Sequence, residues 1–327
     1  MAQLVLGIGT SHTPMLNAPA EDWPRFIDRD GVRDFLDKEG EPASYQDLLR
    51  RVEPHVAAEL TPERFAARHA EAQAGVDRLR ETLRRAELDA LILVGDDHKE
   101  IYRDDNMPAL VVYYGKTIRN VPLNGFSGPD WARRATARYY EEAAPRDYPV
   151  ATGLALHLIN SLIDQEFDPV ASDSLPDGKG EGHAFAFVRK RLMENPELPV
   201  VPVLLNTYFP PTQPTPRRCY WLGQAIRAAV ESYPRNARIG IVGSGGLSHF
   251  IVDEKLDHAV IDACRRKDAA ALQSLPRKKL NSGSSEIRMW ICAAGASEHL
   301  DAKWSSYTPG YRTPAGSGTG LGFLYWA

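Results

Sequence analysis

The feature that most constrains the fold of this chain is an alternation between short apolar runs and longer segments with helical periodicity. Each apolar run is followed by Gly or Asn, which is typical of a buried strand that ends in a turn. The predicted strands are Leu4–Ile8, Ala90–Val94, Ala109–Tyr114, Val200–Leu205 and Ile239–Val242. Apolar residues at three- or four-residue steps predict helices over Pro62–Leu88, Pro129–Ala144, Ala151–Phe167, His183–Glu194 and Tyr220–Ser232. The alternation predicts an α/β fold with a central mixed, largely parallel sheet flanked by helices.

The composition indicates a globular protein whose partner is a small molecule. Of the 327 residues, 43% are hydrophobic and 25% are charged, close to the average for a globular chain. The net charge of −4 is too balanced for a nucleic-acid-binding or anionic-membrane-binding surface. No internal repeat or linker divides the chain. We therefore expect a single catalytic domain over residues 1–327, with a helical insertion at about 20–87.

Three further features predict a cytoplasmic location. Cys219, Cys264 and Cys292 lie far apart without C-x-x-C spacing, so neither a disulfide framework nor a cysteine zinc site is expected. The first apolar run has no basic residue before it, which is typical of a first strand rather than a secretory signal. No apolar run approaches the ~18 residues that a membrane span needs.

The glycine clusters do not match a nucleotide-binding loop. A G-x-G-x-x-G pattern that starts at Gly7 would need glycine at His12, and one that starts at Gly243 would need it at Ser248. The cluster at Gly316 fails in the same way. We therefore interpret these glycines as tight turns after strands.

Three of the nine histidines share one local setting, in which a predicted strand ends, a turn follows and a histidine comes next. His12 follows LGIGTS, His98 follows ILVGDD and His249 follows IGIVGSGGLS. Ligands of open α/β sheets bind beyond the carboxyl ends of the strands, so we expect these imidazoles to meet in one cleft. A lone histidine would more often be a hydrogen-bonded structural residue. Asp96 and Asp97 are either exposed turn residues or groups that orient an imidazole.

Two further residues are candidates for the same site. His183 follows the run DGKGEG and begins a predicted helix, where a neutral imidazole suited to hydrogen-bonding a bound oxygen is favoured. Alternatively, His183 is an ordinary residue at the start of a helix, without a role in the site. Glu286 lies just inside a predicted helix start, where capping explains it only in part, because a capping box would need Ser or Thr at Gly283.

Two neutral imidazoles and one carboxylate form the facial triad of non-heme Fe(II) sites, which leaves coordination positions for a substrate and dioxygen. A histidine that does not bind the metal can move protons near neutral pH. The spacing alone distinguishes neither iron from zinc nor the two histidines that bind.

The chain resembles the class III extradiol ring-cleaving dioxygenases, namely the large subunit of protocatechuate 4,5-dioxygenase and its gallate and 3-O-methylgallate dioxygenase relatives. The resemblance extends over most of the chain, and the combination of motifs is far more specific than any one of them. The matching segments are GIGTSHTPML, ALILVGDDHKEIYRDDNMPAL, SLIDQEFDPVASD, NTYFPPTQPTPRRCYWLGQAIRAAVESYP, GSGGLSHF and SGSSEIRMW.

The resemblance implies that His12, His98 and Glu286 bind Fe(II). It also implies that His249 is the catalytic acid/base and that His183 is a second active-site histidine, although DGKGEGHAFAF lacks the family's more usual D-H-G sequence. The implied reaction is the extradiol cleavage of a substituted, carboxylated catechol-type ring with dioxygen. In that reaction, His249 accepts a proton of the diol and later returns it.

The chain departs from the protocatechuate enzyme in the segment between the first two histidines. Since 86 positions separate His12 from His98, more than in that enzyme, we expect the 20–87 insertion to cover the site in place of a separate small subunit. Two alternatives remain open: a zinc enzyme of the same fold that uses His12, His98 and His249, and a non-catalytic metal-binding or interaction protein. A homo-oligomer, by default a homodimer, is the expected assembly.

Overall fold

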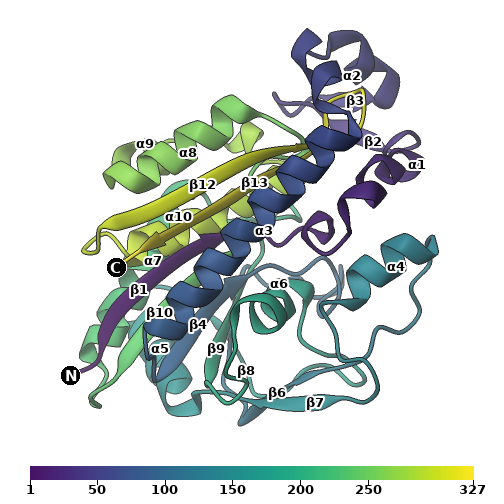
Figure 1. Cartoon of the computed structure of the whole chain (residues 1–327). Helices are drawn as coiled ribbons and strands as arrows, with labels where there is room; N and C mark the ends of the chain where they lie inside the picture. Colours follow the sequence, from purple (N-terminus) through teal and green to yellow (C-terminus); the bar gives the residue numbers. More distant parts are fainter.

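The computed structural model describes all residues from 1 to 327, and its centre is a nine-stranded mixed sheet (Figure 1). Four parallel strands form the middle of the sheet: in spatial order they are β1 (Gln3–Thr10), β10 (Arg238–Ser244), β4 (Ala90–Gly95) and β9 (Val200–Leu205). Because these strands are parallel, their carboxyl ends meet at one edge of the sheet. The predicted α/β fold with a mixed sheet is confirmed.

Antiparallel pairing extends this parallel centre on both sides. Strand β5 (Leu110–Tyr113) runs antiparallel to β9 and carries the short parallel strand β8 (Val170–Ser172). On the other side, β13 (Ser317–Trp326) runs antiparallel to β1 and pairs with β11 (His249–Ile251) and β12 (Ala302–Tyr311). The first strand, β1, therefore lies between β10 and β13. Both of these neighbours come from the last third of the chain.

Helices cover both faces of the sheet, which explains why the central strands are continuously apolar. In β4, Leu91 and Leu93 join the core on one face, whereas Ile92 and Val94 join the core on the other. The first face is covered by α3 (Pro62–Arg85), α4 (Asp130–Ala137) and α6 (His183–Phe187). The second face is covered by α5 (Thr152–Asp164), α7 (Pro216–Ser232), α8 (Glu254–Arg266), α9 (Ala269–Gln273) and α10 (Ile287–Ala296).

The segment predicted as a helical insertion has two parts. Helix α3 begins after Thr61, whose side chain accepts a hydrogen bond from the Arg64 backbone, and its apolar side packs on the sheet (Figure 1). The part before it is not only helical. It contains α1 (Ile27–Asp30), the hairpin of β2 (Asp34–Leu36) and β3 (Pro42–Ser44), and α2 (Tyr45–Arg51).

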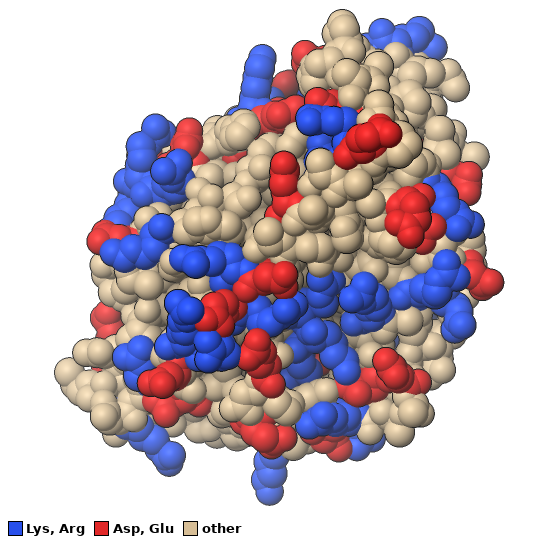
Figure 2. Space-filling view, viewed as in Figure 1, with Lys and Arg blue, Asp and Glu red and all other residues tan.

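The surface has no face of a single charge in the view of Figure 2, where Lys and Arg are interspersed with Asp and Glu. None of the helices has the length and the apolar character needed to cross a membrane. A small two-stranded antiparallel sheet, β6 (Thr117–Asn120) with β7 (Arg146–Pro149), lies below α4 in Figure 1.

All five predicted strands are confirmed, with ends that differ by at most two residues. The helix predicted over Pro129–Ala144 ends at Ala137, and the tyrosines that follow it, Tyr139 and Tyr140, line the cavity described below. The helix predicted over His183–Glu194 is α6 followed by a π-helical turn, Val188–Leu192.

The interpretation of Gly7 and Gly243 as turn residues was wrong, because both lie inside strands. A Cβ on Gly243 would lie 2.5 Å from the carbonyl oxygen of Met289, so helix α10 passes too close to the sheet for any side chain there. Gly316, by contrast, has a φ of +74° in the loop between β12 and β13, a conformation that favours glycine.

Candidate functional site

The structure brings all five predicted site residues to one cavity of about 220 Å³ at the carboxyl ends of the sheet strands. His12 follows β1, His98 follows β4 and His249 begins β11 just after β10. His183 is the first residue of α6, and Glu286 is the last residue of the 3-10 turn that precedes α10. Five elements that are distant in sequence thus deliver one polar side chain each.

Glu286 lies at the centre of this cluster, fully buried, with three imidazoles around its carboxylate. Its Oε2 lies 3.1 Å from Nε2 of His12, and its Oε1 lies 3.0 Å from Nε2 of His249 and 3.3 Å from Nε2 of His98. The Gly246 backbone N–H also donates to Oε2 at 2.6 Å. Burial alone would raise the pKa of Glu286, but His249 and His12 hold it well below its ordinary value. Glu286 is therefore a carboxylate anion.

Hydrogen bonds on the far side of two rings decide which nitrogen faces the cavity. The Ser244 hydroxyl donates to the Ala184 carbonyl at 2.8 Å, so at 3.1 Å it accepts from Nδ1–H of His12. In His249, Nδ1 lies 2.8 Å from the Leu247 carbonyl oxygen, which can only accept. Nδ1 thus carries a hydrogen in each ring, and Nε2, the atom that faces Glu286, is the nitrogen that offers a lone pair whenever the ring is neutral.

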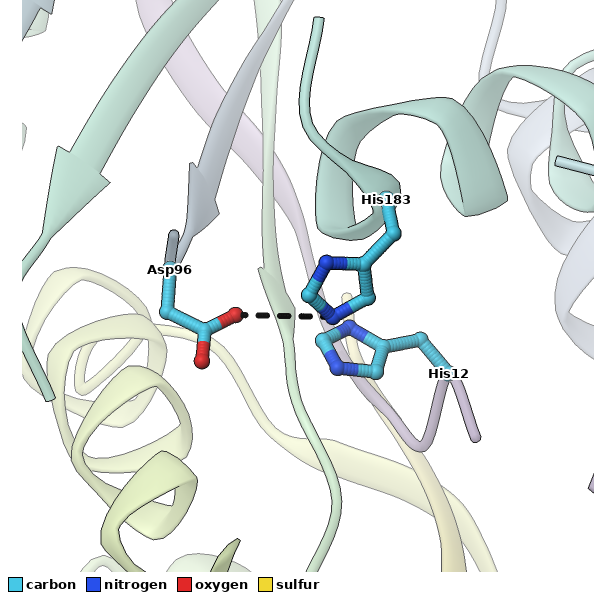
Figure 3. A group of neighbouring side chains, drawn as sticks. All are labelled: His12, Asp96 and His183. Carbon is cyan, nitrogen blue, oxygen red and sulfur yellow. Dashed lines mark ion pairs between the residues drawn. The ribbon is translucent and has the colours of Figure 1, made fainter. Parts of the chain in front are cut away.

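Asp96 is a site residue that the sequence left undecided, and the structure places it against an imidazole inside the site rather than on an exposed turn. It is fully buried, its Oδ2 lies 3.0 Å from Nε2 of His98, and its Oδ1 lies 4.0 Å from Nε2 of His183. Figure 3 shows the Asp96 carboxylate and the rings of His12 and His183 pointing toward one another. Burial alone would lower the pKa of His98, but Asp96 and Glu286 raise it well above its ordinary value.

Asp97 has a different task, because it shapes the loop that carries His98. Its carboxylate accepts the backbone N–H groups of Glu100, Ile101 and Tyr102 at 2.7–3.0 Å. The DDH motif therefore combines one carboxylate that faces an imidazole with one that fixes the backbone around it.

Glu100 is a site residue that the sequence analysis missed. Its Oε2 accepts from the backbone N–H of His183 at 3.1 Å and lies 2.7 Å from Nδ1 of the same residue. The Tyr140 hydroxyl donates to its other oxygen at 2.9 Å. Burial opposes ionisation of both groups, yet their mutual attraction lowers the pKa of Glu100 to about 2 and raises that of His183. With Nδ1 held in this way, His183 presents Nε2 to the cavity.

The donor atoms of this cluster suit a metal cation. Two sets have all their ligand atoms within 4.8 Å of one another: His12 with Asp96 and His183, and Asp96 with His98 and Glu286. Nε2 of His98 and Oδ1 of Asp96 are buried without a hydrogen-bond partner, although Nε2 is close to two carboxylate oxygens. Buried polar atoms are seldom unsatisfied, and imidazoles and carboxylates that converge without hydrogen-bond alignment are placed as ligands of one ion.

Comparison with known protein families gives a match over most of the chain. Residues 53–322 match the family described as the catalytic LigB subunit of aromatic ring-opening dioxygenase. Four of the five predicted site residues lie within these bounds, and His12 precedes them.

Curated relatives match over shorter stretches. Gallate dioxygenase from Pseudomonas putida is 37% identical over 121 residues, which is 35% of this chain and 34% of that protein. A 2,3-dihydroxyphenylpropionate/2,3-dihydroxicinnamic acid 1,2-dioxygenase from Burkholderia vietnamiensis is 34% identical over 31% of this chain and 30% of that protein. The chain thus spans about a third of the length of the curated relatives it matches. An uncharacterized protein of known structure from Escherichia coli K12 aligns over 77% of this chain and 91% of its own, with 15% identity and a TM-score of 0.42.

Proposed function

Because this chain belongs to the family of catalytic LigB subunits of aromatic ring-opening dioxygenases, we propose that it cleaves the ring of a catechol-type diol with dioxygen, in an Fe(II)-dependent extradiol reaction. The observation that carries the proposal is the convergence of imidazole Nε2 atoms on the buried carboxylate of Glu286. The names of the matched relatives, which denote dioxygenases of aromatic acids, support a carboxylated substrate.

In this proposal, His12, His98 and Glu286 hold the iron. His12 and Glu286 fit this role because hydrogen bonds hold both side chains in place. Ser244 engages Nδ1 of His12 and leaves Nε2 toward the cluster, and the Gly246 N–H holds Oε2 of Glu286 next to that Nε2. A bound Fe(II) would supply free coordination positions for the diol and dioxygen and a redox centre between them. Asp96 lies on the same side as the iron in this proposal, because its Oδ2 is 3.0 Å from the Nε2 of His98 that also faces Glu286, so it would be a further carboxylate next to the metal.

His249 is the proposed acid/base. Its Nδ1–H is anchored on the Leu247 carbonyl, so Nε2 can take the second proton of a bound diol without rotation of the ring. The resulting imidazolium is stabilised by Glu286, whose Oε1 lies 3.0 Å away. The same Nε2 then returns the proton. His183, fixed through Nδ1 by Glu100, is placed to hydrogen-bond an oxygen atom in the cavity through Nε2.

A zinc enzyme with three nitrogen ligands is the second candidate. It is favoured by one distance, because Nε2 of His249 lies as close to Glu286 as Nε2 of His12 does. In that arrangement His12, His98 and His249 bind zinc and activate water or a diol. A cytoplasmic location and assembly into a homo-oligomer remain predictions.

The test is anaerobic reconstitution of the purified protein with Fe(II) or with Zn(II), followed by oxygen uptake and visible absorbance with a panel of catechols. We expect stoichiometric oxygen consumption and a new yellow product with Fe(II) only. Tight metal binding without oxygen uptake for any diol would reject the dioxygenase and favour the zinc enzyme or a binding protein.

Two variants separate the proposed roles in the same assay. His249→Phe should keep its iron and lose turnover, because it removes a proton carrier and no ligand. Glu286→Gln should weaken iron binding at least ~10- to 100-fold. That is the loss typical when only a hydrogen-bond partner of a metal ligand is changed, and here a ligand itself is changed. Iron loss in His249→Phe would instead make His249 a ligand.

A further inference from the structure

Three arginines line the same cavity as the metal cluster, and only two of them have an acidic partner. The guanidinium of Arg312 donates to both oxygens of Asp30, at 2.7 and 3.2 Å, and Nε of Arg29 lies 3.4 Å from the same carboxylate. Arg33 lines the same cavity, and no carboxylate lies within ion-pair distance of it. One anion thus faces three cations.

The acidic residues of the cavity do not neutralise Arg33 either. Glu100 is engaged by His183 and Tyr140, and Glu286 by His12, His249 and the Gly246 backbone. The excess of positive charge also affects Arg29, because burial and the neighbouring Arg312 lower its pKa to about 10. These arginines would therefore be stabilised by one more negative charge.

The guanidinium of Arg33 is held in place by an aromatic ring. Its Cζ lies 3.5 Å from the centre of the Phe250 ring, and Phe250 directly follows His249. Stacking occupies the face of a guanidinium and leaves its N–H edges free, in a geometry that matches the two oxygens of a carboxylate. Arg33 is consequently a preorganised anion-binding group beside the proposed acid/base.

We propose that Arg33 binds the carboxylate of the substrate and restricts this enzyme to aromatic diols that carry an anionic substituent. The inference rests on the proposed function, since it assigns specificity within the same cavity. Arg33 lies in the segment between α1 and β2, outside the residues 53–322 that match the family. The segment before α3 therefore contributes specificity as well as cover. The cavity, at about 220 Å³, is smaller than the ~300–1,000 Å³ typical of drug-sized ligands and suits a single-ring acid.

The test compares Arg33→Gln and Arg33→Lys with the parent enzyme on 3,4-dihydroxybenzoate and on catechol, which lacks the carboxylate. For the carboxylated diol, we expect Arg33→Gln to raise KM about 10- to 100-fold with little change in kcat, the effect of losing a charged hydrogen bond. Arg33→Lys should recover part of the loss, and kcat/KM for catechol should change less than about 3-fold. Arg235→Gln, an exposed arginine without an ion pair, is the matched control.

A binding measurement keeps this inference independent of turnover. Titration calorimetry of the metal-free protein with 3-hydroxybenzoate, which is not a diol, should show the same weakening in Arg33→Gln and none in Arg235→Gln. If the iron-loaded enzyme cleaves no diol, the proposed function fails while the binding result still tests Arg33. Equal losses for catechol and 3,4-dihydroxybenzoate, or unchanged 3-hydroxybenzoate binding in Arg33→Gln, would overturn the assignment.

Discussion

Asp257 is a buried carboxylate that fixes the residue next to His249. It accepts the backbone N–H and the hydroxyl of Ser248, both at 2.7 Å, and the hydroxyl of Tyr307 at 2.8 Å. Burial raises its pKa from 3.8 to about 7, because the hydrogen bonds to the charged form compensate only part of the lost hydration. A single residue thus couples the loop before β11 to helix α8 and to β12.

This raised pKa predicts how stability depends on pH. The unfolded chain releases the Asp257 proton near pH 4 and the folded protein near pH 7, so this residue lowers the free energy of unfolding progressively between those values. Asp257→Asn removes that contribution. We expect its free energy of unfolding, relative to the parent, to increase from pH 4 to 7 by up to about 4 kcal/mol and then to level off. Urea unfolding across this range checks it, and parallel curves would contradict it.

The control for this prediction lies on the same helix. Asp262 is half exposed on α8, and Asp262→Asn should follow the parent curve at every pH. A slope in both variants would indicate a general charge effect rather than a buried carboxyl group.

Residue by residue, the sequence showed only those site members that carry a local signal. His12, His98 and His249 each follow a predicted strand and a turn, and that setting identified them. Glu100 has no such signal, because its partner His183 is 83 positions away and the contact exists only in the folded protein. Asp96 could not be assigned from the sequence, because its spacing fits both an exposed turn and a group that faces an imidazole. Only its burial in the folded protein separates the two.

At the level of elements, the position of Glu286 depends on how closely α10 packs against α7. A Cβ on Gly223 of α7 would lie 2.0 Å from the carbonyl oxygen of Cys292, and one on Gly295 of α10 would lie 2.2 Å from that of Tyr220. The two helix backbones are therefore almost in contact. Since α10 starts directly after Glu286, this packing sets the depth of the carboxylate in the site.

Gly223→Ala should separate the two helices. The new methyl group would clash with backbone atoms, which cannot rotate away as a side chain can. We therefore expect a loss of at least about 1–3 kcal/mol in the free energy of unfolding. Metal affinity should fall as well, because Glu286 moves with α10. Calorimetric metal titration and urea unfolding measure the two effects, and a variant as stable as the parent would refute the close packing.

A helical glycine elsewhere provides the comparison. A Cβ on Gly153 of α5 meets only the Tyr233 hydroxyl, at 3.1 Å, which is the end of a flexible side chain. Gly153→Ala should therefore change stability by less than about 1 kcal/mol and leave metal affinity unaltered, in keeping with the higher helix propensity of alanine.

The predictability of the elements follows from their burial on both faces. Strands such as β4 and β9 are apolar at every position and were found from sequence to within one residue at either end. The ten-residue strands β12 and β13 were missed, because most of β12 is only partly buried and carries polar residues, and Gly318, Gly320 and Gly322 lie inside β13. Glycine is depleted in strands, and here neighbouring backbone and side chains take the space of the missing side chains.

For the whole molecule, the open question raised by the sequence is whether the segment before α3 covers the site. Arg29 and Arg33 of this segment line the cavity, and Phe35 of the β2–β3 hairpin shares a core cluster with Ile251 of β11. Helix α3, in contrast, covers the sheet. We therefore propose that residues 20–51, and not the entire 20–87 insertion, act as a cover in cis.

This proposal predicts that the purified single chain is fully active with Fe(II) and needs no second polypeptide. Replacing the β2–β3 hairpin with a short glycine linker should raise KM for the diol and speed the loss of iron activity in air, because it opens the cavity to water. Oxygen uptake by the intact and shortened chains measures both. A requirement for an added subunit, or a shortened chain that behaves like the parent, would reject the cover.

The place of β1 in the sheet has a consequence for how the protein is made. This strand is synthesised before both of its edge partners, because β10 and β13 begin only at Arg238 and Ser317. At a synthesis rate of ~5–20 residues per second, about 15–60 s pass between the synthesis of β1 and that of its second neighbour, β13. During that time an apolar strand with unpaired backbone groups is exposed to aggregation and to chaperones. Yield in a cell should therefore depend on translation speed and chaperone supply as much as on the stability of the finished protein.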